Sequence, residues 1–188
     1  MKKFTLFSDK NRKKSFIQAG LYGGLVVFIW GMFSWMVLPW HHKTMHTFKD
    51  ERKVATVIRD NVTEDGIYAF PSATVKKEKN QPFIVASVRV EGMRCGVACS
   101  VAISALIQIV AAYLITYLLF KTKYTDYRHR VGFVTTIGLL IAILAYLPAW
   151  NWWDFPASYT IVNFVDTIIA WFLGGLVIAK FVKKSLFE

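Results

Sequence analysis

Four long apolar runs constrain the fold of this chain more than any other feature. They cover residues 16–40, 96–120, 131–150 and 155–179, and none of them contains Lys or Arg. A bilayer core about 30 Å thick is crossed by about 20 apolar residues in an α-helix. Because 55% of all residues are hydrophobic, the pattern predicts an all-α integral membrane protein with four transmembrane helices.

The first run is interpreted as a retained signal anchor. It follows a basic start, which is also typical of a signal peptide. Its apolar stretch is longer than the roughly 7–15 residues of a signal-peptide core, and no small-x-small cleavage pattern follows it. We therefore expect this run to remain as the first membrane helix.

The basic residues predict the orientation of the four helices. More than half of the 23 lysines and arginines lie in residues 1–15, 121–130 and 180–188. Cytoplasmic segments carry such an excess, so both termini are predicted to be cytoplasmic in a bacterial inner membrane. Residues 41–95 and 151–154 are then predicted to lie on the extracytoplasmic side of the membrane. On this interpretation, the net charge of +11 reflects the excess of basic residues in cytoplasmic segments. We therefore expect no nucleic-acid binding.

Residues 41–95 have the pattern of a small α+β extracytoplasmic domain. A charged helix is expected around residues 47–61, followed by strands at Ile67–Phe70 and within residues 82–92, where β-branched residues recur. The strands can pair as a hairpin. Because two strands alone are marginally stable, the domain is expected to need cover from its helix, the membrane surface or a partner subunit.

A cluster of histidines follows the first run, in the stretch "WHHKTMH". If the first helix continues past Pro39, then His41, His42, Met45 and His46 lie on one side of it, since each residue turns about 100°. Imidazole and thioether ligands suit copper, and two histidines four residues apart also suit zinc. The alternative is that these are polar residues at a membrane exit.

Cys95 and Cys99 form a second candidate metal element, in "MRCGVAC". The spacing resembles the Cys-x3-Cys element of copper-delivery proteins and of binuclear copper electron-transfer sites, which implies copper ligation by both thiols. The alternative is that both cysteines pack as small apolar residues in a helix. A disulfide within one helical turn has poor geometry.

Asp166 is the one carboxylate within the four runs. It lies about 15 Å from the start of its helix, where an ionised acid costs on the order of 2.5–3.5 kcal/mol. It borders a polar stripe with Asn163 and Thr167, which is expected to face Gln108 and Ser104 on the second helix. The site is either a proton relay in a transporter or a structural acid that is hydrogen-bonded within the chain or paired with a partner subunit.

Small residues mark where helices are expected to pack closely. These are Gly20, Gly24, Gly31 and Gly174. These glycines predict close helix packing, but they do not identify which helix packs against them.

The sequence lacks the motifs of soluble catalysts, such as a nucleophile elbow or a phosphate-binding loop. The leading hypothesis is therefore a non-enzymatic accessory, assembly or scaffold subunit of a membrane complex, which has no cofactor and binds a membrane-protein partner or forms a homo-oligomer. The alternatives are a copper-binding or copper-delivery protein and a small proton-coupled transporter that uses Asp166.

Overall fold

The computed structural model describes residues 10–72, 79–123 and 126–182. The outer parts of the predicted terminal segments and the middle of the predicted 121–130 loop lie outside the described residues. The chain divides into two compact units. One comprises the residues up to Met45 and from Ala98 onward, here called the bundle, and the other is His46–Val97, here called the hairpin unit.

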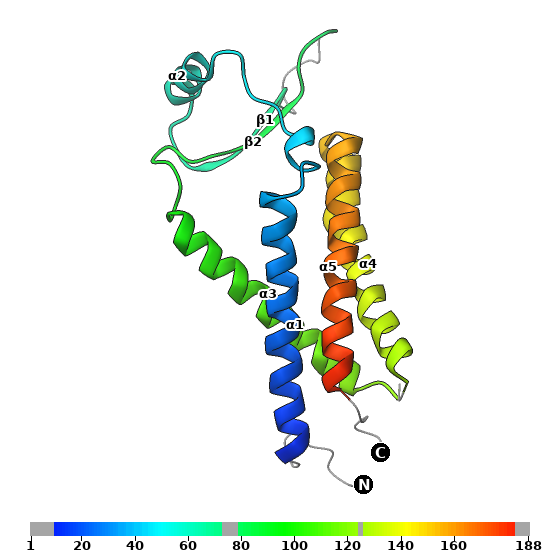
Figure 1. The fold of residues 1–188 in the computed structure, drawn as a ribbon. Helices are drawn as coiled ribbons and strands as arrows, with labels where there is room; N and C mark the ends of the chain where they lie inside the picture. The colour runs from blue at the N-terminus through cyan, green and yellow to red at the C-terminus, as the bar shows by residue number, and fades with distance from the viewer. Residues whose placement is uncertain (1–9, 73–78, 124–125, 183–188) are drawn as a thin grey trace. The chain divides into compact units, whose positions relative to one another are not determined.

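Four helices form the bundle: α1 (Lys10–Met36), α3 (Val97–Phe120), α4 (Tyr127–Trp153) and α5 (Ala157–Phe181). Each is long and apolar enough to cross a membrane. In Figure 1, α1, α4 and α5 run alongside one another and α3 crosses obliquely. The expected helical protein with four candidate spans and a small two-stranded sheet is therefore confirmed.

Every helix differs from its predicted boundaries at one end or both, and two of these ends change the expected loops. α1 stops at Met36, before Pro39, and not at residue 40. A proline disfavours helical geometry in the residue before it and cannot donate a backbone hydrogen bond. α4 extends to Trp153 with Pro148 inside it, so the predicted outer loop is the last turn of a helix.

Glycines allow α5 to pack closely on both of its antiparallel neighbours. A side chain at Gly174 would meet Val27 of α1, and one at Gly23 would meet Ile178 of α5. On the other side, Gly138 of α4 lies against Trp171. The apolar core lies along these contacts and includes Val27, Val134, Ala170, Trp171 and Ile178.

α3 packs on the bundle through one half only. Its buried residues begin at Ala112, and its earlier turns expose apolar side chains such as Leu106. It meets α1 at two predicted glycines: a Cβ at Gly20 would collide with the Tyr113 ring, and one at Gly24 would lie 2.5 Å from Cα of Ile109. Gly31, also predicted to pack, has nothing within 4 Å of its Cβ position.

Polar groups stabilise the end of the bundle at which α4 begins. Asp126 is the N-cap of α4, and its carboxylate accepts hydrogen bonds from the backbone N–H groups of His129 and Arg128. The hydrogen bond from His129, followed by that from Arg128 and the charges of both side chains, holds the pKa of Asp126 below its usual value. Arg130 is buried, and its Nε donates to the carbonyl of Ala179 near the end of α5.

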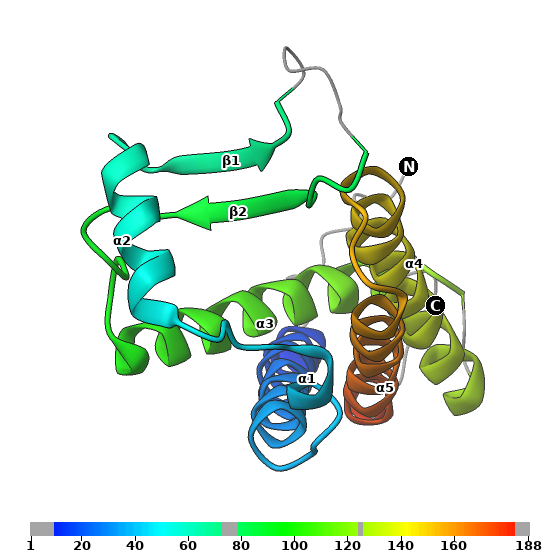
Figure 2. The same cartoon turned by 90° about the horizontal axis from the view of Figure 1, so that it is seen from above.

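The hairpin unit consists of α2 (Glu51–Asn61), β1 (Gly66–Phe70) and β2 (Ile84–Val88). Asp50 caps α2 by accepting a hydrogen bond from the N–H of Lys53. The strands are antiparallel, with Tyr68 opposite Ala86. Figure 2 shows α2 lying across one end of the two strands.

The contact between α1 and α3 can be tested with two glycines of one helix. We predict that Gly24→Ala destabilises the bundle by about 1–3 kcal/mol, the typical cost of overpacking, because the new methyl group meets the backbone of Ile109. Unfolding in detergent micelles measures the effect. Gly31→Ala, which faces open space, is the matched control, and equal stability of the two variants would contradict the contact.

Candidate functional site

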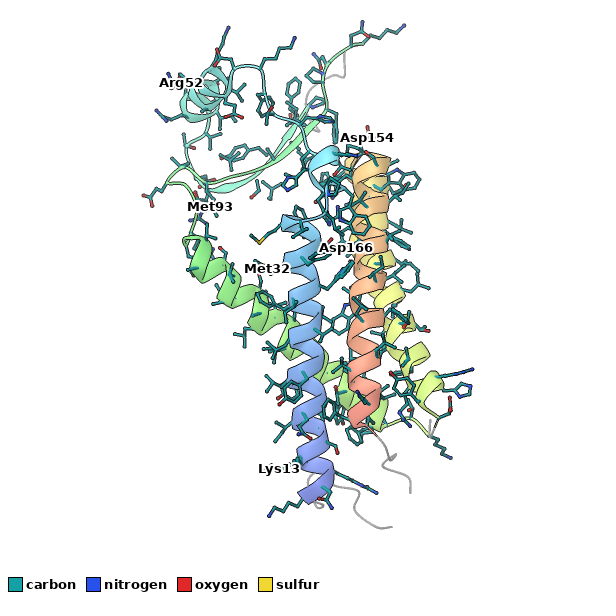
Figure 3. The ribbon with its side chains drawn as sticks, viewed as in Figure 1. Lys13, Met32, Arg52, Met93, Asp154 and Asp166 are labelled. Carbon is teal, nitrogen blue, oxygen red and sulfur yellow. The ribbon has the colours of Figure 1, made fainter. Side chains whose placement is uncertain are left out.

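Asp166 is held by hydrogen bonds at the interface between α5 and α1. Its Oδ1 accepts a hydrogen bond of 2.7 Å from the indole Nε1 of Trp30. Its Oδ2 lies 3.3 Å from Nε2 of His41. Figure 3 shows Asp166 between α1 and α5, well below the level of Asp154 at the end of the bundle. Both carboxylate oxygens therefore have partners.

His41 reaches Asp166 because the chain turns back after α1. Residues 37–45, here called the return turn, leave the helix before Pro39 and include the short 3₁₀ segment His42–Thr44. The carbonyl of His41 accepts hydrogen bonds from the backbone N–H and the hydroxyl of Thr44. The side chain of His41 is fully buried. The turn thus folds an imidazole into the bundle instead of exposing it at a helix end.

Serine and tryptophan side chains enclose the imidazole. Ser34 Oγ accepts a hydrogen bond of 2.9 Å from the indole of Trp40 and lies 3.1 Å from His41 Nε2. The Trp35 ring stacks on the imidazole with centroids 4.0 Å apart and planes at 11°. The Trp40 ring stands nearly perpendicular to it at 5.7 Å. These residues, together with Trp30 and Asp166, are here called the His41–Asp166 site.

The electrostatics of the site follow from its burial. A charge inside a helix bundle is tolerated when it is paired and hydrogen-bonded, whereas removal of one partner leaves an uncompensated charge. Asp166 forms an ion pair with His41 when the imidazole is protonated, and a hydrogen bond when it is neutral. The site can therefore join α1 to α5.

The structure gives Asp166 different partners from those predicted. Gln108 lies half-buried on α3, where its backbone oxygen is beside Gly24, and Ser104 is exposed. Asn163 is buried on α5 and donates to the carbonyl of Tyr159. Thr167 lies 3.4 Å from the hydroxyl of Tyr146. The stripe on α5 is therefore polar as expected, but Asp166 contacts Trp30 of α1 and His41 of the return turn, and not α3.

The predicted metal ligands are dispersed. The first helix does not continue past Pro39, so the shared helical face on which the histidine hypothesis depended does not exist. His41 faces Asp166, whereas His42 and Met45 are exposed. His46 and Cys95 belong to the hairpin unit and Cys99 to the bundle. Among the described residues, no group of three or more His, Cys, Asp or Glu side chains is placed to hold a metal ion.

Sequence reasoning missed four members of the site: Trp30, Ser34, Trp35 and Trp40. It also assigned His41 to a metal site or to a membrane exit, and not to a contact with Asp166. One signal for these contacts was available in the sequence. Pro39 is expected to end the helix, and the residues after it, Trp40 and His41, can then turn back toward the bundle. The direction of that turn depends on contacts with a residue 125 positions away, which no local pattern encodes.

No family model, curated protein or solved structure matches this chain. The role of the His41–Asp166 site therefore depends on its own geometry and chemistry.

A double-mutant cycle measures the coupling of the site. We predict that His41→Ala and Asp166→Ala are coupled by about 2 kcal/mol in the free energy of unfolding, as expected for a hydrogen bond between charged groups. The matched control is the longer contact between Thr167 and Tyr146, where Thr167→Ala and Tyr146→Phe should couple by about 0.6 kcal/mol or less. Additive effects of the first pair would show that the two residues do not interact.

Proposed function

We propose that the protein is a non-enzymatic accessory or scaffold subunit of a membrane complex. In this proposal, the bundle anchors the chain and the hairpin unit binds a partner protein. The observation that carries the proposal is that none of the described residues from His46 to Val97 is buried. A unit with one helix and two strands but no core needs another surface to complete it.

Exposed apolar side chains indicate where that surface is needed. Ile67 on β1 is 69% exposed, Phe48 before α2 is 67% exposed, and Met93 after β2 is 76% exposed. Burial of a side chain of this size stabilises a complex by about 1.5–3 kcal/mol. Both strands of the sheet also have one edge that is not paired within it, and such edges can pair with another chain.

A groove of about 280 Å³ between α2 and β2 supplies a specific place for a partner side chain. Ala55, Ile58, Val62 and Val88 contribute its apolar lining, and Arg59 lies at its side. Arg89 also lines it, but this side chain is paired with Asp65 at 3.1 Å. The groove fits an apolar side chain with an acidic neighbour that can reach Arg59.

The charges of α2 favour a protein partner over a lipid surface. Helices that lie on anionic membranes carry a predominantly basic polar face. In α2 the acids Glu51 and Asp60 flank the basic residues Arg52, Lys53 and Arg59. A face of mixed sign suits complementary charges on a protein.

Partner binding can be tested in the full-length protein. We predict that Ile58→Glu, which places a carboxylate in the apolar groove, weakens the complex by about 2 kcal/mol or roughly 30-fold. Purification in mild detergent from native membranes, with the co-purifying proteins counted by mass spectrometry, measures the loss. Val57→Glu, which adds the same carboxylate at an exposed position of α2 that does not line the groove, is the matched control and should retain the partner. A wild-type protein that purifies as a self-contained oligomer would exclude this function.

We also propose that the hairpin unit lies outside the cytoplasmic membrane of a bacterium, with both termini in the cytoplasm. The lysine and arginine excess of the opposite segments supports this orientation. The bundle supports it in one further respect, since α1 and α5 are antiparallel and place their basic ends, at Lys13 and Lys180, on the same side.

Thiol labelling tests the orientation. In a Cys95→Ser/Cys99→Ser background, we predict that a cysteine at position 79 (Lys79→Cys) reacts with a membrane-impermeant maleimide in intact cells. A cysteine at position 128 (Arg128→Cys) should react only after the cells are opened, because it lies on the basic side. The reverse pattern would invert the topology.

A further inference from the structure

We infer that a groove between α4 and α5 binds an anionic phospholipid, with one acyl chain in the groove and the phosphate at Arg128. The inference goes beyond the proposed function, because it concerns a lipid ligand of the bundle and not a partner of the hairpin unit. It requires that the bundle crosses a membrane, but it does not depend on which end of the bundle faces the cytoplasm.

The groove has a volume of about 500 Å³, which is within the range of roughly 300–1,000 Å³ that is typical of ligand pockets. Its wall on α4 consists of residues spaced three or four apart, which share one helix face: Arg128, Gly132, Thr136 and Leu139. Ile168 and Phe172 of α5 line the opposite wall. Leu139 is 39% exposed and Phe172 is 42% exposed, so the groove opens onto the surface of the bundle.

Gly132 leaves the middle of this groove unfilled. A Cβ atom at Gly132 would have no heavy atom within 4 Å, whereas one at Gly138, the next glycine of α4, would collide with Trp171. Close packing of α4 on α5 therefore requires Gly138 but not Gly132. A glycine inside a helix is less favourable than an alanine, and no contact within the described bundle offsets this cost at Gly132. Its effect is to provide a depression in the wall.

The two threonines of the groove present an apolar surface. The hydroxyl of Thr135 donates a hydrogen bond of 2.9 Å to the carbonyl of Val131, and that of Thr136 donates one of 2.9 Å to the carbonyl of Gly132. Both hydroxyls are thus paired within their own helix. An acyl chain can cover them without leaving a buried polar group unpaired, which would be unfavourable.

The length of the groove matches one leaflet of a bilayer. Arg128 and Leu139 lie at its two ends on α4, and they are about 16 Å apart along the helix axis at 1.5 Å per residue. A hydrocarbon core about 30 Å thick allows about 15 Å for each leaflet. A membrane helix of a partner or of a second copy would contact the bundle along the whole core. The length therefore favours a single acyl chain.

Arg128 supplies a complementary charge for the phosphate. It is the one charged residue among those that line the groove in the described part of the chain, and it is exposed. A guanidinium can bind phosphate oxygens through two parallel N–H groups. The carboxylate of Asp126 is close in sequence, but it accepts the backbone N–H groups of Arg128 and His129 and lies 3.3 Å from Nδ1 of His129.

The same end of the bundle carries other basic side chains. Figure 1 shows that the end of α3, the start of α4 and the end of α5 lie together there. Lys121 and Lys123 follow α3, Lys180 lies in the last turn of α5, and all three are exposed. Basic residues near a bilayer surface attract anionic lipids. These charges therefore concentrate anionic headgroups at this end, where the groove can hold the lipid whose phosphate contacts Arg128.

Native mass spectrometry of the full-length protein in detergent tests the inference. The protein is titrated with phosphatidylglycerol, which is anionic, and with phosphatidylcholine, which has the same acyl chains and no net charge. We expect the wild type to bind phosphatidylglycerol about fivefold more tightly, the effect of one basic residue near a lipid surface. Arg128→Gln should remove this preference. Equal affinities for the two lipids in the wild type would overturn the inference.

A matched charge control is available at the same end of the bundle. Lys180→Gln removes an exposed charge outside the groove and should keep the preference for phosphatidylglycerol. If it lowers the preference as much as Arg128→Gln does, the attraction is to the basic end as a whole and the inference is wrong. Inorganic phosphate should displace no more lipid than chloride does at the same ionic strength. Specific displacement by phosphate would show that Arg128 binds the free anion.

Filling the groove tests the site of the acyl chain. Gly132→Leu should weaken the binding of both lipids by about tenfold, as expected when two or so methylene groups lose their place. Gly31→Leu is the matched control, because Gly31 also faces open space but lies on α1 outside the groove. Unchanged lipid binding in Gly132→Leu would overturn the inference. If Gly132→Leu changed the oligomeric state instead, the groove would be an interface between copies.

A measurement on the wild type alone guards against misfolded variants. The full-length protein is placed in nanodiscs that contain phosphatidylglycerol with a photoreactive diazirine in its acyl chain, and the crosslinked residues are identified by mass spectrometry. We expect crosslinks at residues 132–139 and 168–172 at least about fivefold more often than at the exposed half of α3 around Leu106. Equal crosslinking of the two regions would show that the groove does not select this lipid.

Discussion

The structure depends on the requirement that an acid inside an apolar helix bundle must be paired. Asp166 lies about ten residues into α5 and is buried there, where an unpaired acid is unfavourable. Trp30 and His41 supply the hydrogen bonds that it needs. Because both come from α1 and the residues just after it, the pairing joins the first membrane helix to the last and draws the return turn into the bundle.

Close helix contacts make this pairing possible. Gly23 and Gly174 bring α1 and α5 near enough for the Trp30 indole to reach the Asp166 carboxylate, about two turns away along each helix. The glycines supply proximity, and the polar residues supply specificity, since van der Waals contact between apolar helices in lipid does not select one register strongly. α3, which has apolar contacts through only one half, joins the bundle at Gly20 and Gly24.

The bundle and the hairpin unit differ in what can cover their exposed apolar side chains. In the bundle, lipid can surround the apolar side chains that the helices leave exposed, such as Leu106 of α3. The hairpin unit has mixed charges and exposed apolar residues but no buried residue in its described part. Under the proposed function, a partner protein completes this unit.

The four candidate membrane helices, the α2 helix and the strand pair could all be predicted from the sequence, because each depends on local pattern. The patterns are the length of the apolar runs, the charged stretch at residues 47–61, and the β-branched residues of the two strand segments. The sequence also identified Asp166 as the residue that needs a partner, because the cost of an acid in a membrane does not depend on its neighbours. It could not identify that partner. Gln108 was expected to face Asp166, whereas His41 was assigned to a metal site or a membrane exit. Only the tertiary structure decided between them, because the choice depends on which helices the glycines bring together and on how the chain turns after Pro39.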